Sequence, residues 1–284
     1  MDRPKPFPIL RLPFLAIEEV FKAMHPLEII NFCLIAERNK QITNMMTFCS
    51  KYSVALDINK ILKIAIRGTN NIVSGIYEMT SEKNLDGVIG YVVGGFKLTV
   101  FKYSKDPIEG WKQLSKHVLD IFNKHTIDTL TVDMDEFVNY NVSIIDFLKT
   151  NEISVNKCSL FHWYSNINID KHAAYLLENI KINNEFNFYL HIKNVNLDLK
   201  IPKGLTKLKM INTNWIEYKQ LLEIDSVTVD KWISMETNLN LELLDFVFES
   251  MKEFKDGVLF DIPYEVVDNG VKRDIKTRSG ISRE

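Results

Sequence analysis

Asp133, Asp135 and Glu136 are the best carboxylate cluster in the chain. Carboxylates are ligands that calcium and magnesium prefer, so a metal site is one interpretation of this cluster. The cluster lacks the spacing of a calcium-binding loop, and it follows an apolar stretch that is typical of a strand. We therefore interpret these acids as solvated side chains that end a strand and cap the next helix, and we expect no metal.

Other groups that could do chemistry are few. His162 and His172 have no second histidine three or four residues away, so zinc coordination is not expected. The sequence shows neither the nucleophile elbow of a hydrolase nor a phosphate-binding loop. We expect no cofactor and no catalytic activity. An enzyme of unknown type would have to use the carboxylate cluster alone.

Four glycines, Gly87, Gly90, Gly94 and Gly95, could suggest a loop that cradles a phosphate. Such a loop has to lead into a helix, whose N-terminus meets the anion. The residues after Gly95 alternate between apolar and polar, which predicts a strand. The glycines therefore indicate a tight hairpin between two strands and not a nucleotide site.

The bulk composition narrows the class of protein. A chain of 284 residues with 46% hydrophobic residues favours two folded pieces, each with its own core. The 35 basic and 37 acidic residues nearly cancel, so no overall field attracts nucleic acid or a membrane surface. No apolar run is long enough to span a bilayer, and no signal peptide is recognisable, which predicts a cytosolic or nuclear protein. Cys33, Cys49 and Cys158 are expected to be reduced thiols, most of them buried.

The elements at the N-terminus are predicted to be three short helices. Ile17, Val20, Phe21 and Met24 lie on one helical face, and Pro26 ends that helix and opens the next. The second helix is apolar on two faces, and apolar positions at helical spacing predict a third. Three helices in about forty residues bury little surface by themselves. Their exposed stripes face either the protein's own second domain or a partner protein.

The residues that open these helices resemble a known family. The run 7–13, which reads FPILRLP, and the positions that follow it look like the F-box of nematode F-box proteins. The resemblance implies a three-helix module, over residues 5–50, that inserts into the Skp adaptor of SCF-type cullin–RING ubiquitin ligases. The matching positions that would contact the adaptor are Leu12, Pro13, Ile17, Val20, Pro26, Leu27 and Ile29.

Residues 51–125 are predicted to be a strand-rich connector. Leu62, Ile64 and Ile66 alternate with polar residues, as in a half-buried strand. Asp106 and Pro107 form a capping start for a helix that closes the connector.

Residues 126–267 carry a recurring strand motif, apolar at the first, fourth and sixth positions, with helical spacing between the copies. The copies recur irregularly at 19 to 31 residues, which brackets the leucine-rich repeat of about 20 to 29 residues. The pattern predicts an irregular, leucine-rich-repeat-like α/β solenoid that binds proteins through its strands. Its C-terminal stretch is similar to the type 2 F-box-associated domain. The copies of the strand motif begin at Ile127, Val155, Leu205 and Ile224, with a degenerate strand from Phe186 to Ile192.

Residues 268–284 are expected to be a flexible tail.

Together these features predict an α+β chain whose F-box binds a Skp-family adaptor, and through it a cullin, while the repeat domain binds an unknown protein substrate. The alternative is a repeat-type interaction module without a ligase connection. The two differ at the surface of the N-terminal helices. An adaptor exposes the Leu12–Pro13 turn and the face of Ile29, and a cap buries them. Trp111, Trp163, Trp215 and Trp232 lie in apolar segments and are expected to be core or repeat-ladder residues, with a binding hot spot as the alternative for one of them.

Overall fold

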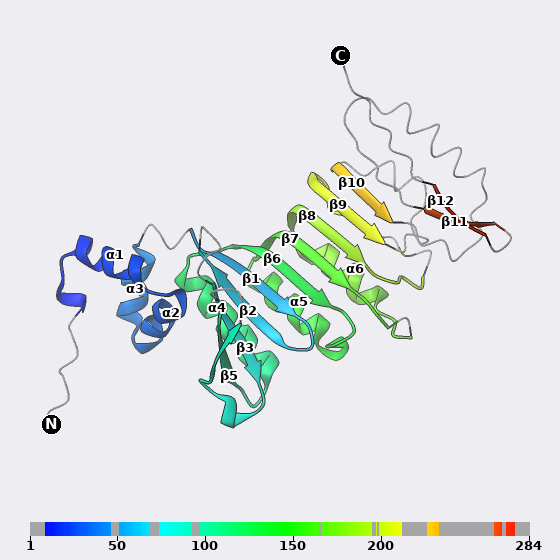
Figure 1. Cartoon of the computed structure of the whole chain (residues 1–284). Coiled ribbons are helices and arrows are strands. Elements are labelled where there is room, and N and C mark those ends of the chain that lie inside the picture. Colours follow the sequence, from blue (N-terminus) through cyan, green and yellow to red (C-terminus); the bar gives the residue numbers. More distant parts are fainter. Residues whose placement is uncertain are drawn as a thin grey trace, which may run out of the picture. The chain divides into compact units, whose positions relative to one another are not determined.

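The chain is mixed α/β and divides into two compact units, residues 1–128 (unit one) and residues 129–284 (unit two). Figure 1 labels the elements along the chain. The computed structural model describes residues 9–46, 51–68, 74–92, 97–164, 166–194, 197, 199–211, 226–232, 264–268 and 271–275.

Unit one begins with the three predicted helices, and this part of the prediction is confirmed. A short 3-10 turn, η1 (Ile9–Arg11), precedes α1 (Phe14–Ala23), α2 (Pro26–Ile35) and α3 (Glu37–Asn44). The third helix ends before Met45, which the apolar pattern had placed within it.

Capping explains why α1 stops and α2 starts. His25 is extended and precedes a proline at the first helical position, so α1 cannot continue through it. The Nδ1 atom of His25 accepts a hydrogen bond from the Leu27 N–H at 3.2 Å, and the His25 N–H donates to Glu28 Oε2 at 2.8 Å. This reciprocal pair is a capping box with histidine in the role usually taken by serine or threonine.

The strands of unit one follow in the order β1-β2-β3-β5-β4 across the sheet. The first three pair antiparallel, β5 lies parallel to β3, and β4 pairs antiparallel with β5. The last pair confirms the predicted hairpin strands, while Gly94 and Gly95 lie outside the described residues. The bounds are β1 (Ser53–Ile58), β2 (Leu62–Arg67), β3 (Ser74–Thr80), η3 (Lys83–Leu85), β4 (Ile89–Val92) and β5 (Lys97–Tyr103).

One face of this sheet is covered by α4 (Pro107–Ile121), which begins where the sequence predicted it. Asp106 Oδ1 accepts hydrogen bonds from the N–H groups of Ile108 and Glu109, at 3.0 and 3.1 Å. Trp111 is fully buried, and its Nε1–H donates to the Lys63 carbonyl at 3.2 Å. With 15 residues, α4 is the longest described helix, and no helix in the described part of the chain is long and apolar enough to cross a membrane.

Helix α2 packs against β3 at a glycine. A Cβ atom at Gly75 would lie 2.5 Å from Leu27 Cγ and 3.1 Å from His25 Cε1, so the helix approaches the strand closer than any side chain permits. Beside this contact the Tyr77 hydroxyl reaches Asn31 Oδ1 at 3.5 Å. The N-terminal helices therefore belong to the packing of unit one.

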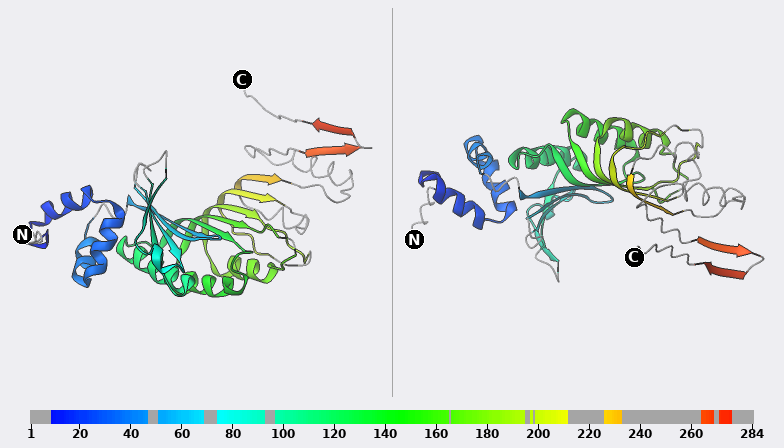
Figure 2. Two further views of the ribbon diagram at one scale, coloured as in Figure 1. Left: turned by 60° about the horizontal axis from the view of Figure 1, so that its bottom comes forward. Right: turned by 90° about the horizontal axis from the view of Figure 1, so that it is seen from above.

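Unit two repeats a strand followed by a return segment. Strands β7, β8, β9 and β10 pair in sequence order, and each pair is parallel. Figure 2 shows α5 and α6 on one face of these strands. The elements are β6 (Thr126–Asp133), η4 (Val138–Tyr140), α5 (Asn141–Thr150), β7 (Ser154–Phe161), α6 (Asp170–Asn179), β8 (Ile182–Tyr189), β9 (Leu205–Ile211) and β10 (Ser226–Trp232), and a separate hairpin of β11 (Tyr264–Asp268) and β12 (Val271–Ile275).

The motif positions of the repeated strands face the core. Cys158 pairs with Phe186, and Phe186 pairs with Leu208, all three buried. In β10 the residue opposite Leu208 is Val229, whereas the motif aligned Val227 there. The offset between the motif and the pairing is two residues, an even number, so the alternation along the strand is the same in both.

The expected boundary between residues 50 and 51 falls inside unit one, and the one between 125 and 126 falls just before β6. Ile224, the helix predicted around Leu241 and the last nine residues of the tail lie outside the described residues.

The α2–β3 contact predicts the effect of a single methyl group. Gly75→Ala should lower the free energy of unfolding by about 1 to 3 kcal/mol, because Leu27 has to move to admit the new Cβ. Denaturant unfolding of the whole chain measures the change. Gly90→Ala in β4 is the matched control, since the nearest side-chain atom there is 3.9 Å away. Equal effects at the two glycines would contradict the close approach.

Candidate functional site

The seven residues matched to the adaptor-binding motif divide into two groups. Pro13 is exposed, and Leu12 and Val20 are half-buried. The other four are buried, which removes them from direct contact with another protein in this arrangement. They are Ile17, Pro26, Leu27 and Ile29.

The burial of Ile29 corrects the expectation that its face is open. Ile29 has no exposed surface, and Ile17 of α1 is also buried. Phe21 of α1 meets Phe32 of α2 edge to face, with ring centroids 5.2 Å apart. The face of α2 that carries Ile29 is thus buried in the packing of unit one. Of the two features that separate an adaptor from a cap, the Leu12–Pro13 turn exposes Pro13 and half of Leu12, whereas the Ile29 face is buried.

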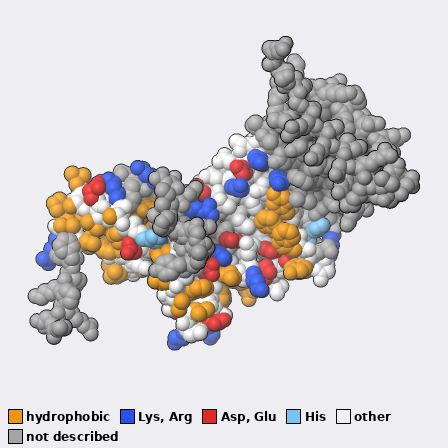
Figure 3. Space-filling view, viewed as in Figure 1, with side chains coloured by type: hydrophobic (Ala, Val, Ile, Leu, Met, Phe, Trp, Pro, Cys, Tyr) orange, Lys and Arg blue, Asp and Glu red, His pale blue; other side chains and the backbone are white. Residues whose placement is uncertain are grey.

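Other apolar side chains take the exposed positions on these helices, and the motif did not single them out. Figure 3 shows hydrophobic side chains gathered over the N-terminal helices. Large apolar groups in contact with water at this density are typical of a surface that binds another protein. We call them, together with Pro13, the N-terminal apolar residues: Phe14 (45% exposed), Leu15 (73%), Leu34 (49%), Ile35 (76%) and Met45 (64%).

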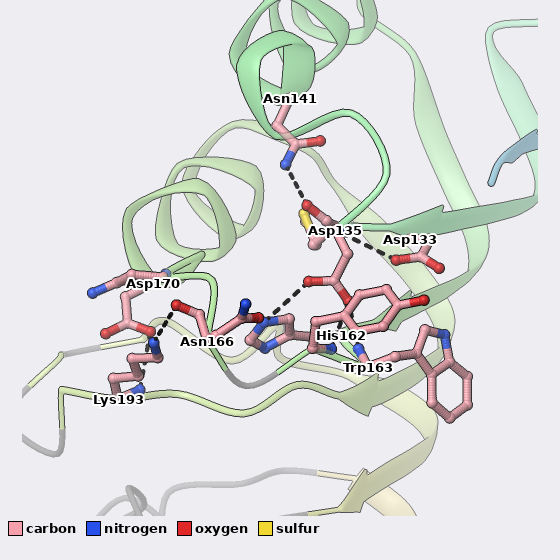
Figure 4. A network of polar contacts seen from close by, with 11 residues as sticks. Asp133, Asp135, Asn141, His162, Trp163, Asn166, Asp170 and Lys193 are labelled. Carbon is pink, nitrogen blue, oxygen red and sulfur yellow. Dashed lines mark hydrogen bonds and ion pairs between the residues drawn. The ribbon is translucent and has the colours of Figure 1, made fainter. Parts of the chain in front are cut away.

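The carboxylate cluster of unit two is arranged differently from the prediction. Asp133 and Asp135 are buried, and only Glu136 is exposed. The expectation of three solvated acids is therefore wrong for two of them. Burial raises the pKa of Asp133 above that of an ordinary aspartate. Figure 4 shows where these side chains point.

Asp135 holds the backbone that follows β7. Its Oδ2 atom accepts hydrogen bonds from the N–H of Trp163 at 2.5 Å and of Tyr164 at 3.1 Å. Its Oδ1 atom lies 3.1 Å from Nε2 of the fully buried His162 side chain, within ion-pair distance. The Asp135 N–H in turn donates to Asp133 Oδ1 at 3.1 Å.

A second buried carboxylate repeats this arrangement one strand further along. Asp170, at the start of α6, accepts from the N–H groups of Lys193 at 3.1 Å and Asn194 at 2.8 Å. The Lys193 ammonium donates to the Asn166 carbonyl at 2.9 Å. Both aspartates therefore organise the chain segments that leave β7 and β8.

The hydrogen bonds of this network support the backbone that follows the strands. In the described part of the chain no group of three His, Cys, Asp or Glu side chains could hold a metal ion. Comparison with models of known protein families, with curated proteins and with solved structures finds no match to this chain.

Sequence reasoning missed the pair of Asp135 and His162, which are far apart in the chain. A signal was present, since Asp135 comes just after β6 and His162 just after β7, and neighbouring strands bring such positions together.

The tryptophans differ in their burial. Trp111 is buried as predicted, but Trp163 is 67% exposed, so its prediction as a core residue is wrong. Trp215 lies outside the described residues, and only the backbone of Trp232 is described.

The two hydrogen bonds to Asp135 predict a loss of stability. Asp135→Ala should lower the free energy of unfolding by about 2 to 4 kcal/mol, because two backbone N–H groups lose a charged acceptor. Glu136→Ala is the control, and its exposed side chain should change stability by less than about 0.5 kcal/mol. Chemical denaturation measures both, and a neutral Asp135→Ala would contradict the supporting role.

The histidine cap of α2 predicts a dependence on pH. Burial lowers the pKa of His25 below its usual value of about 6.5, against the opposing effect of Glu28. The unfolded chain therefore takes up the proton first, so this contribution to stability is present above about pH 6.5 and is lost as the pH falls below it. Unfolding of the wild type and of His25→Asn, an uncharged cap, should show a shallower loss of stability in the variant between about pH 7 and pH 5. Parallel curves would contradict this assignment.

Proposed function

We propose that this protein is a non-catalytic substrate-recognition subunit of an SCF-type cullin–RING ubiquitin ligase. Its N-terminal helices would bind a Skp-family adaptor, and unit two would bind a protein substrate. The observation that carries the proposal is the row of exposed apolar residues at the start of α1, Pro13, Phe14 and Leu15, on a three-helix segment that resembles an F-box.

The positions of these residues support a docking role for the segment. Leu15 and Ile35 are each about three-quarters exposed, at opposite ends of the α1–α2 pair in the sequence. Exposed groups of this size gain affinity when they enter pockets of a partner. The buried residues of the motif, Leu27 and Ile29 among them, would set the angle at which the exposed ones are presented.

A second function has an observation in its favour. Pro26, Leu27 and Ile29 are buried inside unit one, as expected if the three helices are an integral part of that unit. The protein would then be an interaction module without a ligase connection. In that case, the exposed residues of α1 would contact no adaptor.

The proposal includes a finer description of unit two, an irregular leucine-rich-repeat-like solenoid. Its support is the consecutive parallel pairing of β7 to β10 and the repeated core register of Cys158, Phe186 and Leu208. In such an arrangement each strand hides its apolar face against the next unit and leaves its other face open. This open face would hold the substrate.

The role assigned to the chain is to bring two proteins together. A substrate held beside the ligase core meets the ubiquitin carrier at a high effective concentration, which raises the transfer rate without any catalytic group from this chain. The proposed compartment is the cytosol or the nucleus.

Co-purification with a Skp-family adaptor tests the proposal. The wild-type chain should form a one-to-one complex. Leu15→Asp and the double variant Leu12→Ala/Pro13→Ala should each weaken it by about thirtyfold or more, because a hot-spot residue contributes about 2 kcal/mol. These residues are exposed or half-buried, so the variants should keep the wild-type melting temperature.

Ile89→Asp is the matched control, since Ile89 is an apolar residue of unit one that is 51% exposed and lies in β4, away from the helices. It should bind like the wild type. If the wild-type chain binds no adaptor, or if Leu15→Asp binds as well as Ile89→Asp, the ligase role has to be given up in favour of the interaction module.

A further inference from the structure

Three aromatic side chains stack where β7 and β8 end, and Tyr164 follows them directly in the chain. Phe161 and Tyr189 are register partners on these parallel strands, and their rings stack with centroids 5.0 Å apart. The ring of Trp163 also stacks on Phe161, with centroids 5.6 Å apart and the two rings nearly parallel. With Tyr164 they form what we call the aromatic surface.

Two side chains of the aromatic surface are largely exposed to solvent. Trp163 is 67% exposed and Tyr164 is 60% exposed. Figure 3 shows hydrophobic side chains on this face of unit two, with basic and acidic side chains around them. Large aromatic groups in these surroundings are the commonest hot spots of protein interfaces.

The backbone beneath the aromatic surface is fixed. The buried Asp135 carboxylate accepts from the N–H groups of both Trp163 and Tyr164. Between the two strands the His162 N–H donates to the Tyr189 carbonyl at 3.0 Å. The backbone that carries the aromatic groups is thus already ordered before binding, so this segment loses little backbone entropy when a partner binds.

The charges on the same strand face are mainly positive. In β7 to β9 the charged residues that alternate onto the same strand face as Phe161 and Tyr189 are Lys157, Glu185, Lys207 and Lys209, three basic residues and one acidic, with Lys157, Glu185 and Lys207 paired across the strands. Lys157 and Glu185 form an ion pair at 2.9 Å, and the Lys209 ammonium lies 5.9 Å from the centre of the Tyr189 ring. An ammonium group beside stacked aromatic rings is complementary to a carboxylate that accompanies an apolar side chain.

We propose that the aromatic surface binds an acidic protein segment that carries an aromatic or large aliphatic side chain. The apolar side chain packs against Trp163 and Tyr164, and the acidic residues lie toward Lys209. The assignment rests on the proposed role of unit two in substrate binding and names the class of substrate, but its contacts do not involve the N-terminal helices.

Selection from a random peptide library displayed on phage, with the full chain as bait, tests the inference. The enriched peptides should share an apolar residue flanked by Asp or Glu. One of them, made with a fluorescent label, then serves as the probe in fluorescence polarisation. Trp163→Ala should weaken its binding by about thirtyfold and Lys209→Glu by about tenfold, and added salt should weaken it further.

Matched controls lie in the same unit. Tyr140→Ala removes a different exposed aromatic group, on η4, and Lys200→Glu reverses a different exposed lysine. Both should bind the probe like the wild type. No enrichment, a basic consensus, or equal binding by Trp163→Ala would overturn the inference, as would binding of an oligouridine that depends on Trp163, because stacked aromatics with lysines also suit single-stranded nucleic acid. Adaptor co-purification is scored separately, so failure here leaves the ligase proposal intact.

Discussion

Burial of α2 is the constraint on which unit one depends. The helix is apolar around most of its circumference, and Leu27, Ile29 and Ile30 are almost completely removed from water. It can be buried on this scale because Gly75 leaves room for Leu27 on β3 and because Phe21 closes the opposite side. With α2 buried in this way, the apolar side chains that stay exposed on this segment include those at the ends of α1 and α2. Exposure of Leu15 and Ile35 is then a consequence of the same packing that hides Ile29.

Unit two meets a different requirement, since the segments that leave its parallel strands have backbone groups to satisfy. Two buried aspartates, Asp135 and Asp170, meet it by accepting pairs of backbone N–H groups. A carboxylate is suited to this task because it is a charged acceptor with two oxygens. The acids that looked most like chemistry in the sequence are therefore part of the frame that supports the exposed side chains.

Local patterns predicted the elements well. Period and capping signals were enough for the three N-terminal helices, for α4 after Asp106 and for the core face of β7, because each depends on neighbours in the sequence. The sequence could not show which apolar face is covered. Ile29 and Leu15 are equally apolar in the sequence, and their opposite exposure depends on β3 and α1. The same holds for Trp163 and for the pair of Asp135 and His162, whose surroundings come from strands far apart in the chain.

The bonds from Asp135 reach the backbone at positions 163 and 164 and not the side chains there. Every amino acid except proline supplies such an N–H group. Natural selection can therefore replace Trp163 or Tyr164 with almost any residue while the loop keeps its course. The composition of this exposed surface can therefore change without a change in the fold beneath it.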